Sequence, residues 1–212
     1  MFVADWMTRQ VITVEPQDSV LRAMHLMRER GIKHLPVVKG GKLAGVISDR
    51  DIKSYCPSKA TSLDVYEINY LLSQAAVQDA MGRRLVTIAP EAPVEEAAMT
   101  MLDENIGCLP VVAGDTLVGI ISDKDIYRAL VDISGVRHAG HRICVVIADR
   151  PGSVKEVADI VRKHGFHMRG IMTSYEGVPE GSRRAVIRTT NEGDFAPLRA
   201  ELEKAYGGAT VK

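Results

Sequence analysis

The sequence predicts a mixed α/β protein built from two similar units and a third, unrelated one. Residues 5–52 align with residues 79–126 without a gap, and 21 of these 48 pairs are identical. Both copies alternate short β-rich runs with helical patterns, whereas the segment after residue 142 has its own order of elements. A duplicated unit usually places two copies of one site on a pseudo-twofold axis. We therefore expect two packed repeats followed by a small separate domain.

Each repeat begins with a short strand and a helix. Residues 11–14, and 85–88 in the second copy, form a β-rich run that ends at Pro16 or Pro90. Apolar residues then recur at 20, 23, 24 and 27, and at 94, 97, 98 and 101. This is the spacing of a helix that buries one face.

A strand pair and a second helix complete each repeat. In the first copy, residues 35–38 and 43–47 are apolar runs joined by the turn-forming residues 39–42, and a helix is expected from about Asp49. The best-matched segments are the Leu-Pro-Val-Val run and the Gly-x-x-Ser-x-x-Asp run. A unit of about fifty residues is too small to close a core comfortably, so the two copies should pack together.

The end of the Gly-x-x-Ser-x-x-Asp run carries the candidate chemistry. An apolar strand delivers Ser48 to the first turn of a helix, where free N–H groups and the helix dipole favour an anion such as phosphate. Asp51, three residues on, lies on the same face and can accept two hydrogen bonds from a vicinal diol. The alternative is purely local: Ser48 or Asp49 caps the helix, and Asp51 is a favourable first-turn charge.

Both repeats resemble the CBS-domain family, whose repeats carry a leucine-proline-valine-valine strand and a Gly-x-x-Ser/Thr-x-x-Asp ending. The resemblance implies clefts between the repeats that bind AMP, ADP or ATP, or alternatively S-adenosylmethionine or NAD. It also implies roles by position. Asp51 and Asp125 would hold ribose hydroxyls, Ser48 and Ser122 would lie near phosphate with Arg50 and Lys124, Thr13, Val14, Thr87 and Ile88 would face adenine, and Lys33, His34, Leu35, Pro36, Cys108, Leu109 and Pro110 would complete the pockets. Because His34 is matched by Cys108, we expect the two sites to differ in affinity.

The C-terminal third predicts a different fold. An apolar strand over 143–148 leads into a Pro-Gly turn, a helix follows, and Gly165 ends that helix. Two further strands over 166–175 and 184–190, a helix over 195–202 and a β-rich tail complete the order βαββαβ. This order is the ferredoxin-like arrangement.

The turn after the first of these strands resembles that of the ACT-domain family. It reads Asp149, Arg150, Pro151, Gly152, Ser153. The resemblance implies a regulatory amino-acid site in which N–H groups receive the carboxylate. In the alternative reading these residues form only a turn and the domain only dimerises. Two CBS repeats followed by an ACT domain are similar to the acetoin-utilisation type of bacterial regulatory proteins.

The sequence also predicts the domain bounds. We expect the first repeat over 1–56, a connecting loop and helix over 57–78, the second repeat over 79–134, a linker over 135–141 and the ACT-like domain over 142–212. Within the connection, residues 57–62 read as a loop, and the apolar spacing from Val65 to Leu72 predicts a helix. That helix would cover either its own core or a partner subunit.

Bulk composition predicts a cytoplasmic protein. The 27 basic and 27 acidic residues give a formal net charge of zero, which argues against nucleic acid as a partner. No apolar run reaches the length of a membrane helix and no signal peptide is apparent. The three cysteines fit a reducing compartment and predict no disulfide framework.

The sequence favours a regulator over an enzyme. His138, His141 and Cys144 have zinc-ligand types, but no fourth ligand lies nearby, so we expect no metal. Asp49 and its neighbours lack a nucleophile and base, so we expect no catalysis. The leading hypothesis is a ligand-sensing homodimer or higher oligomer that signals to an unknown protein. The alternatives are a dimerising module that binds nothing small and, third, an enzyme acting on a bound nucleotide.

Overall fold

The computed structural model describes residues 1–56, 64–82, 84–207 and 210–211. The chain forms two compact units, Met1–Ile126 and Tyr127–Lys212, and each is described by itself. The division falls within helix α7 (Asp123–Ile133), so the linker expected over 135–141 lies inside the second unit. The predicted loop over 57–62 lies outside the described residues.

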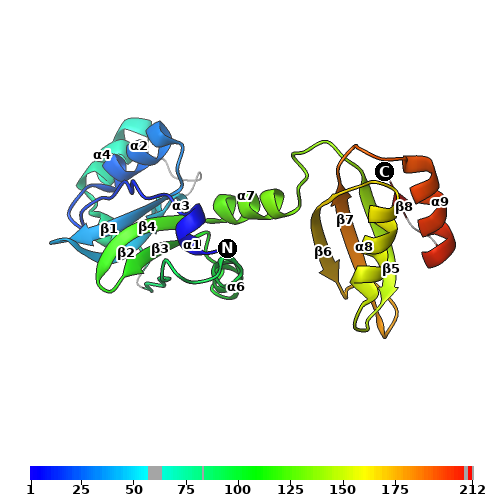
Figure 1. The fold of residues 1–212 in the computed structure, drawn as a ribbon. Coiled ribbons are helices and arrows are strands. Elements are labelled where there is room, and N and C mark those ends of the chain that lie inside the picture. Colours follow the sequence, from blue (N-terminus) through cyan, green and yellow to red (C-terminus); the bar gives the residue numbers. More distant parts are fainter. Residues whose placement is uncertain (57–63, 83, 208–209, 212) are drawn as a thin grey trace. The chain divides into compact units, whose positions relative to one another are not determined.

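The first unit contains the two repeats, and its longer helices and its strand pairs follow the order that the sequence predicts (Figure 1). The strands expected over 11–14 and 85–88 are only single bridges at Val14 and Ile88, and a four-residue helix that the sequence does not predict precedes each of them. The mixed α/β fold class is thereby confirmed. The elements are α1 (Val3–Trp6), α2 (Val20–Arg30), β1 (His34–Lys39), β2 (Lys42–Ser48), α3 (Asp49–Tyr55), α4 (Val65–Gln74), α5 (Val77–Ala80), α6 (Val94–Asp103), β3 (Cys108–Ala113), β4 (Thr116–Ser122) and the start of α7.

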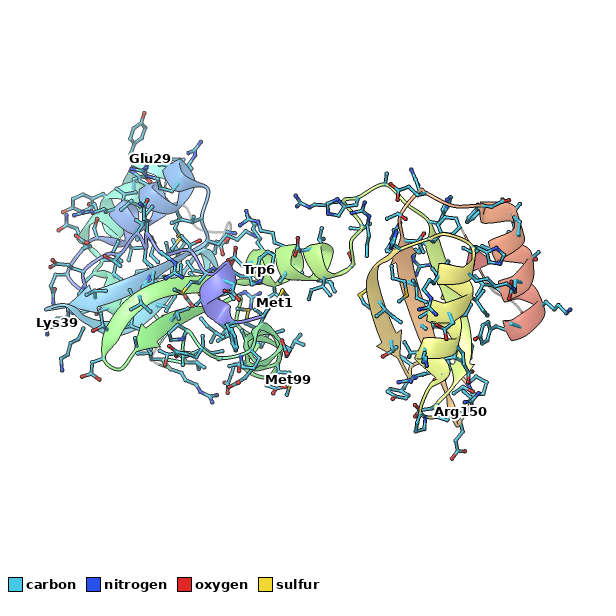
Figure 2. All side chains as sticks on the ribbon, in the orientation of Figure 1. Met1, Trp6, Glu29, Lys39, Met99 and Arg150 are labelled. Carbon is cyan, nitrogen blue, oxygen red and sulfur yellow. The ribbon has the colours of Figure 1, made fainter. Side chains whose placement is uncertain are left out.

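Each repeat has an antiparallel strand pair with a third segment beside it. In the first repeat β1 pairs with β2, and the N–H of Val14 donates to the carbonyl of Pro36 at 3.1 Å while that of Val38 donates to Val14 at 2.9 Å. In the second repeat β3 pairs with β4, and Ile88 makes the same two bonds. Lys39 lies at the tip of the first hairpin (Figure 2), where two glycines at positive φ form the turn. The strands β2 and β4 contact each other across the two repeats.

The N-terminal segment packs on the second repeat, not on its own. The N–H of Val3 donates to the carbonyl of Ala92 at 2.9 Å, and Thr8 exchanges two backbone hydrogen bonds with Ile120. The side chains of Val3 and Met7 are buried in the hydrophobic core of the second repeat. The first eight residues therefore complete the copy to which they do not belong in sequence.

The equivalent segment of the second copy makes the reciprocal packing. The N–H of Val77 donates to Asp18 at 2.8 Å, and that of Val20 donates to Ala75 at 2.9 Å. Val77 is fully buried in the core of the first repeat, with Met81 packed against it. The two repeats thus exchange their first segments, and neither core is complete without the other copy.

The second unit has the ferredoxin-like order βαββαβ that the sequence predicts. Its elements are β5 (Arg142–Ala148), α8 (Ser153–Lys163), β6 (Met168–Ser174), β7 (Ser182–Thr189), α9 (Phe195–Tyr206) and β8 (Thr210–Val211). The strands form one sheet in the order β6-β7-β5-β8, and every neighbouring pair is antiparallel.

Helices α8 and α9 cover one face of this sheet. Alternate residues of β5 point to that face, so Ile143, Val145 and Ile147 are buried while Cys144 and Val146 lie on the other side. Val157 from α8 and Leu198 from α9 pack on the buried residues.

Among the described residues of the chain, no helix has the length and hydropathy needed to cross a membrane.

Candidate functional site

The first candidate site lies where β2 meets α3. Ser48 is the N-cap of α3, and its Oγ accepts a hydrogen bond from the N–H of Asp51 at 3.1 Å. In return the Oδ2 of Asp51 accepts from the N–H of Ser48 at 2.8 Å and from its hydroxyl at 2.6 Å. This arrangement is a capping box. The capping role that the sequence offers for the Ser-x-x-Asp run is therefore present. In the described part of the chain, the other carboxylate oxygen of Asp51, Oδ1, has no hydrogen-bond partner.

The second repeat has the same arrangement where β4 meets α7. The Oδ2 of Asp125 accepts from the N–H of Ser122 at 2.9 Å and from its hydroxyl at 2.7 Å. Asp125 is 5% exposed, which is rare for a carboxylate, and it has interactions beyond those two. The two junctions are thus equivalent in geometry, although Asp51 is less deeply buried than Asp125.

The strand ladder brings the residues before β1 to this junction. His34 is the register partner of Ser48, and the N–H of Asp49 donates to the carbonyl of Lys33 at 2.9 Å. In the second repeat Cys108 is the register partner of Ser122, and Asp123 donates to Gly107. Residues that lie 14 or 16 positions apart in the sequence are therefore adjacent in each copy.

His34 lies at the boundary between the two repeats. A Cβ added to Gly107 of the second repeat would be 3.0 Å from Cε1 of His34, so the imidazole lies directly against that glycine. Burial holds the pKa of His34 below its ordinary value, and the nearby carboxylates of Asp123, Asp49 and Asp51 act in the opposite direction. The site of one copy therefore meets the helix start of the other.

Cys108 occupies the position of His34 in the second copy. It is buried, and burial raises the pKa of its thiol to about 12, with smaller contributions from the charges of Asp123 and Asp51. A thiol with this pKa stays protonated at neutral pH and neither ligates metal nor attacks electrophiles readily. The two copies therefore present different chemistry at one equivalent place, as the mismatch in sequence predicts.

The other predicted site residues divide by exposure. Thr13, Thr87, Lys33, Arg50 and Lys124 are exposed. Val14, Leu35, Pro36, Ile88, Leu109 and Pro110 are buried, and those of them that belong to the two repeat cores can take part in binding mainly through their backbone.

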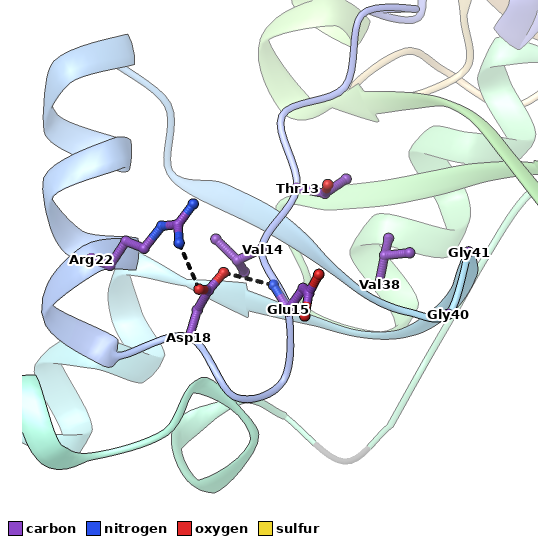
Figure 3. A pocket seen from close by; sticks show the side chains of 8 residues that line it. All are labelled: Thr13, Val14, Glu15, Asp18, Arg22, Val38, Gly40 and Gly41. Atoms are coloured by element: carbon purple, nitrogen blue, oxygen red, sulfur yellow. Dashed lines mark hydrogen bonds and ion pairs between the residues drawn. The ribbon is translucent and has the colours of Figure 1, made fainter.

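A pocket of about 360 Å³ lies beside the first repeat's third segment (Figure 3). It is lined by Thr13, Val14, Glu15, Asp18, Arg22, Val38, Gly40 and Gly41. It shares Thr13 and Val14 with the predicted adenine contacts but contains neither Ser48 nor Asp51. Sequence reasoning missed its other residues. One difference between the copies could have indicated them: the polar residues Glu15, Asp18 and Arg22 are replaced in the second copy by Ala89, Ala92 and Glu96.

Asp18 of this pocket is held by two hydrogen bonds from other lining residues. Arg22 donates to Oδ1 of Asp18 at 2.8 Å, and the N–H of Glu15 donates to Oδ2 of Asp18 at 2.8 Å (Figure 3). The side chain of Thr13 points away from this pair in the same view. The pocket and the Ser-x-x-Asp junctions are therefore separate features of the first repeat.

The turn between β5 and α8 is the candidate site of the second unit. Gly152 is the N-cap of α8 with φ at 88°, a conformation that favours glycine. Arg150, at the exposed end of this unit in Figure 2, forms an ion pair with Glu156 at 2.8 Å. The hydroxyl of Ser153, which is buried, donates to the carbonyl of Arg150 at 2.9 Å.

Arg183 of β7 is a residue at this turn that sequence reasoning missed. Its Nη2 donates to Oγ of Ser153 at 3.1 Å, and its Nε lies 3.6 Å from Oδ1 of Asp149. That Nε is buried and has no hydrogen-bond partner among the described residues. Only the pairing of β5 with β7 brings Arg183 here, so no local sequence signal could have found it.

The candidate zinc residues are not gathered. His141 stacks on Phe195 with ring centroids 3.8 Å apart and meets Phe166 edge-on. Within the described ranges, no three side chains of histidine, cysteine, aspartate or glutamate lie close enough to hold a metal ion.

Comparison with known proteins identifies the repeats. The family model of the CBS domain matches residues 3–58 and again residues 77–132. An inosine-5′-monophosphate dehydrogenase of Korarchaeum cryptofilum is 34% identical over 160 residues, which are 72% of this chain but 30% of that relative. The chain thus spans under a third of that enzyme. The CBS domain-containing protein YhcV of Bacillus subtilis is 32% identical over 58% of this chain and 81% of its own length.

Solved structures agree with this match. The AcuB protein of Vibrio cholerae has a TM-score of 0.53 and 33% identity, covering 65% of this chain and 95% of that one. The CBS domain pair of protein MJ0100, in complex with 5′-methylthioadenosine and S-adenosyl-L-methionine, has a TM-score of 0.51 and 27% identity over 61% of this chain and 95% of that chain. CBSX2 in complex with AMP has a TM-score of 0.51 and 29% identity over 62% and 97%.

Proposed function

The chain belongs to the CBS-domain family, and from this premise we propose that its repeat pair is a regulatory module that senses an adenosine-containing ligand. AMP, ADP and ATP are the expected ligands, followed by S-adenosylmethionine and NAD. The observation that carries the proposal is the doubled Ser-x-x-Asp junction, in which both aspartates accept from the N–H and the hydroxyl of the serine. His34, the register partner of Ser48, lies against Gly107 of the other repeat.

The residues of each junction fit the chemistry of a nucleoside phosphate. The open Oδ1 of Asp51 would accept from a ribose hydroxyl. Arg50 and Lys33 are exposed cations beside the first turn of α3 that would attract phosphate. Thr13 would offer its side chain, and the buried Val14 and Leu35 their backbone, to the base. In the second copy Ser122, Lys124 and Thr87 would have the equivalent roles. Asp125 would also hold ribose hydroxyls, alongside the interactions that it already makes.

Two structural neighbours support the ligand class. One CBS pair is known in complex with 5′-methylthioadenosine and S-adenosyl-L-methionine, and another in complex with AMP. The three molecules share an adenosine moiety and differ at the 5′ position. The shared part matches the proposed hydroxyl acceptor, whereas Arg50 and Lys124 favour a 5′ phosphate over a sulfonium. We therefore expect a nucleotide to bind more tightly than S-adenosylmethionine.

The proposal is tested by screening AMP, ADP, ATP, NAD and S-adenosylmethionine by thermal shift and calorimetry. A ligand at a hundred times its dissociation constant stabilises the folded state by about 2.7 kcal/mol. Each kcal/mol is worth about 2 to 4 °C in a chain of this size. Inosine and guanosine nucleotides are the matched controls. If no ligand gives a shift or heat, the dimerising module without a small ligand is the correct reading; conversion of the nucleotide would indicate the enzyme.

The second unit supports a second candidate function, an amino-acid site of the ACT type. The specific observation is the buried Nε of Arg183, which lacks a hydrogen-bond partner beside the glycine turn that begins α8. An α-carboxylate at this turn would satisfy that donor, and the carboxylate of Asp149 would attract the α-amino group. Arg150, Pro151 and Ser153 would shape the turn.

Screening the amino acids by calorimetry tests this second function independently of the nucleotides. Arg183→Gln should abolish the heat of any amino acid that binds, while Arg162→Gln, whose guanidinium pairs with Asp159 on α8, should preserve it. Binding that is equal in both variants would place the site elsewhere.

We also propose that the protein acts in the cytoplasm as a homodimer or a higher oligomer that passes its signal to a partner protein. Large apolar side chains are exposed on α4, α6 and α7, including Tyr66, Leu102 and Tyr127. Exposed apolar side chains on a helix are available for contact with another chain. Sedimentation should show no monomer at micromolar concentration, and a monomer throughout that range would contradict the proposal.

A further inference from the structure

The face of the β6-β7-β5 sheet that α8 and α9 leave uncovered has an ordered pattern of side chains. Residues 133–135 of the chain lie over one end of this face, against Gly170, Arg169 and Arg188, and the rest of the face has no helix on it. Strand register aligns this pattern in rows that cross the strands. The first row contains Arg142, Arg188 and Gly170. The second contains Cys144, Val186 and Met172, and the third contains Val146, Arg184 and Ser174. An apolar row therefore lies between two rows that carry arginine.

The first row concentrates positive charge. Arg142 and Arg188 are direct register partners across β5 and β7. Arg169, at the bulge of β6, joins them, because a Cβ added to Gly135 would lie 3.4 Å from Cβ of Arg169 and 3.7 Å from Cβ of Arg188. In the part of the chain that the structure describes, these three arginines have no ion-pair partner, and the three rows contain no aspartate or glutamate.

Such an arrangement costs stability in the isolated unit. Like charges directly opposite each other on neighbouring strands are destabilising. Arg184, in the third row, is restrained by donating to the carbonyls of Glu176 and Gly177 at 3.4 and 3.1 Å, but it forms no ion pair with any carboxylate of the described ranges. An unneutralised cluster next to an apolar row indicates a surface whose stabilising anion comes from another molecule.

The spacing of the rows defines the shape of the occupant. Successive rows are two residues apart, about 6.8 Å along a strand, so the two arginine rows are separated by about 14 Å. An α-helix is about 10 to 12 Å wide with its side chains. A helix laid along the apolar row would place its apolar stripe on Cys144, Val186 and Met172 and direct residues on both flanks toward arginine.

Two other occupants fit less well. In a symmetric pairing with a second copy of this face, the arginines of one copy would meet those of the other, which repels. A single-stranded nucleic acid would match the charge, but binding of this kind depends on aromatic side chains on which bases stack, and the three rows contain none. The apolar row is better matched by leucine-like side chains.

We propose that this sheet face docks an acidic amphipathic helix of a partner protein, with an apolar stripe flanked on both sides by carboxylates. The guanidinium groups of Arg142, Arg169, Arg184 and Arg188 bind the flanking carboxylates, for which their forked geometry is suited. The apolar row buries the stripe. This interaction is independent of the adenosine site of the first unit.

The test uses the full chain and a fluorescein-labelled model helix that has a leucine stripe flanked by glutamates. Its twin has lysine at every glutamate, and a labelled single-stranded RNA is the third probe. Fluorescence anisotropy should show binding of the glutamate helix, at least tenfold weaker binding of the lysine helix, and weakening of the first with added salt. The double variant Arg142→Gln/Arg188→Gln should bind the glutamate helix at least tenfold more weakly. The control Arg162→Gln/Arg199→Gln changes arginines of α8 and α9 and should bind like the wild type.

A further variant distinguishes a lost binding surface from a misfolded domain. Arg188→Glu should bind the lysine helix more tightly than the wild-type protein does, a gain that an unfolded domain cannot give. The unliganded double variant should melt at the same temperature as the wild type or higher, because the like-charge pair is removed. The proposal is overturned if the glutamate helix does not bind, if both helices bind equally, if RNA binds more tightly, or if Arg188→Glu leaves the preference unchanged.

Discussion

At the scale of single residues, one serine and one aspartate in each repeat have a structural role whatever they bind. Ser48 and Asp51 cap α3 reciprocally, which stabilises a helix by about 0.5 to 2 kcal/mol. The sequence predicts both this local role and a ligand role, and the geometry is compatible with both because capping uses only one carboxylate oxygen. The exposure of Arg50 and the burial of Leu35 could not be predicted locally, since they depend on how the repeats pack.

The two roles of Asp51 and Asp125 are separated by replacing each with asparagine. An amide oxygen can still accept from the serine, so the fold should survive, but the charge that strengthens a bond to ribose is lost. Charge-assisted hydrogen bonds are worth about 1.5 to 3 kcal/mol, so calorimetry should show at least a tenfold loss of nucleotide affinity. Asp49→Asn is the control, because Asp49 pairs with Lys53 on α3 at 2.9 Å. Unchanged affinity in the double variant would limit both residues to capping.

His34 should make the first unit sensitive to acid. Its pKa is lowered in the folded protein, so the unfolded chain takes up the proton first as the pH falls through about 6.5. The free energy of unfolding should therefore decrease below that pH, and His34→Gln should lose less stability between about pH 7.5 and about pH 5.5. Urea unfolding at the two pH values measures the difference, with His25→Gln, an exposed histidine of α2, as the control. Equal losses in wild type and His34→Gln would refute the assignment.

At the scale of elements, two short helices decide how the repeats join. Helices α1 and α5 have four residues each, too few for a periodic pattern to predict a buried face. Glycines of β2 and β4 make room for the methionines that follow these helices: a Cβ on Gly45 would be 2.8 Å from Sδ of Met81, and one on Gly119 would meet Met7 and lie 3.2 Å from the carbonyl of Thr8. The long helices were predictable from their own residues, whereas this exchange is a property of tertiary contacts.

The fit of Met7 against Gly119 predicts the effect of one added methyl group. In Gly119→Ala the new Cβ meets both a side chain and the backbone of Thr8, so the segment must shift, and overpacking of this kind costs about 1 to 3 kcal/mol. Chemical denaturation measures the loss. Gly82→Ala is the matched control, because its Cβ would meet no atom within 4 Å. Equal stability of the two variants would show that the segment with Met7 and Thr8 can shift without loss of free energy of unfolding.

At the scale of the whole molecule, the residues that the structure describes form three hydrophobic cores, two of which depend on residues from both repeats. The third core belongs to the second unit, whose βαββαβ order the sequence predicts correctly because each element there packs on its own neighbours. The expected first repeat over 1–56 contains its own strands and helices but not its own first segment.

Removal of residues 1–8 should therefore weaken the second repeat more than the first. The deletion takes the fully buried Val3, and Met7 with it, from the core around Leu109 and Ile121. Hydrogen exchange should accelerate over 106–122 and change little over 34–48. Val3→Ala should reproduce the effect in milder form, with a loss of stability of about 1 to 3 kcal/mol. Faster exchange in the first repeat alone would contradict the observed exchange of segments.

The exchanged segments also bear on how such a chain could have arisen. A single repeat with these contacts would have lacked the partner for its own opening segment and could not have closed its core as a monomer. It would have folded only as a pair of identical chains, each lending its first residues to the other. Joining two genes end to end would then have changed no contact in that pair. The association, which depends on concentration between separate chains, would have become intramolecular. The two halves, no longer identical by necessity, were then free to diverge, as His34 and Cys108 have done.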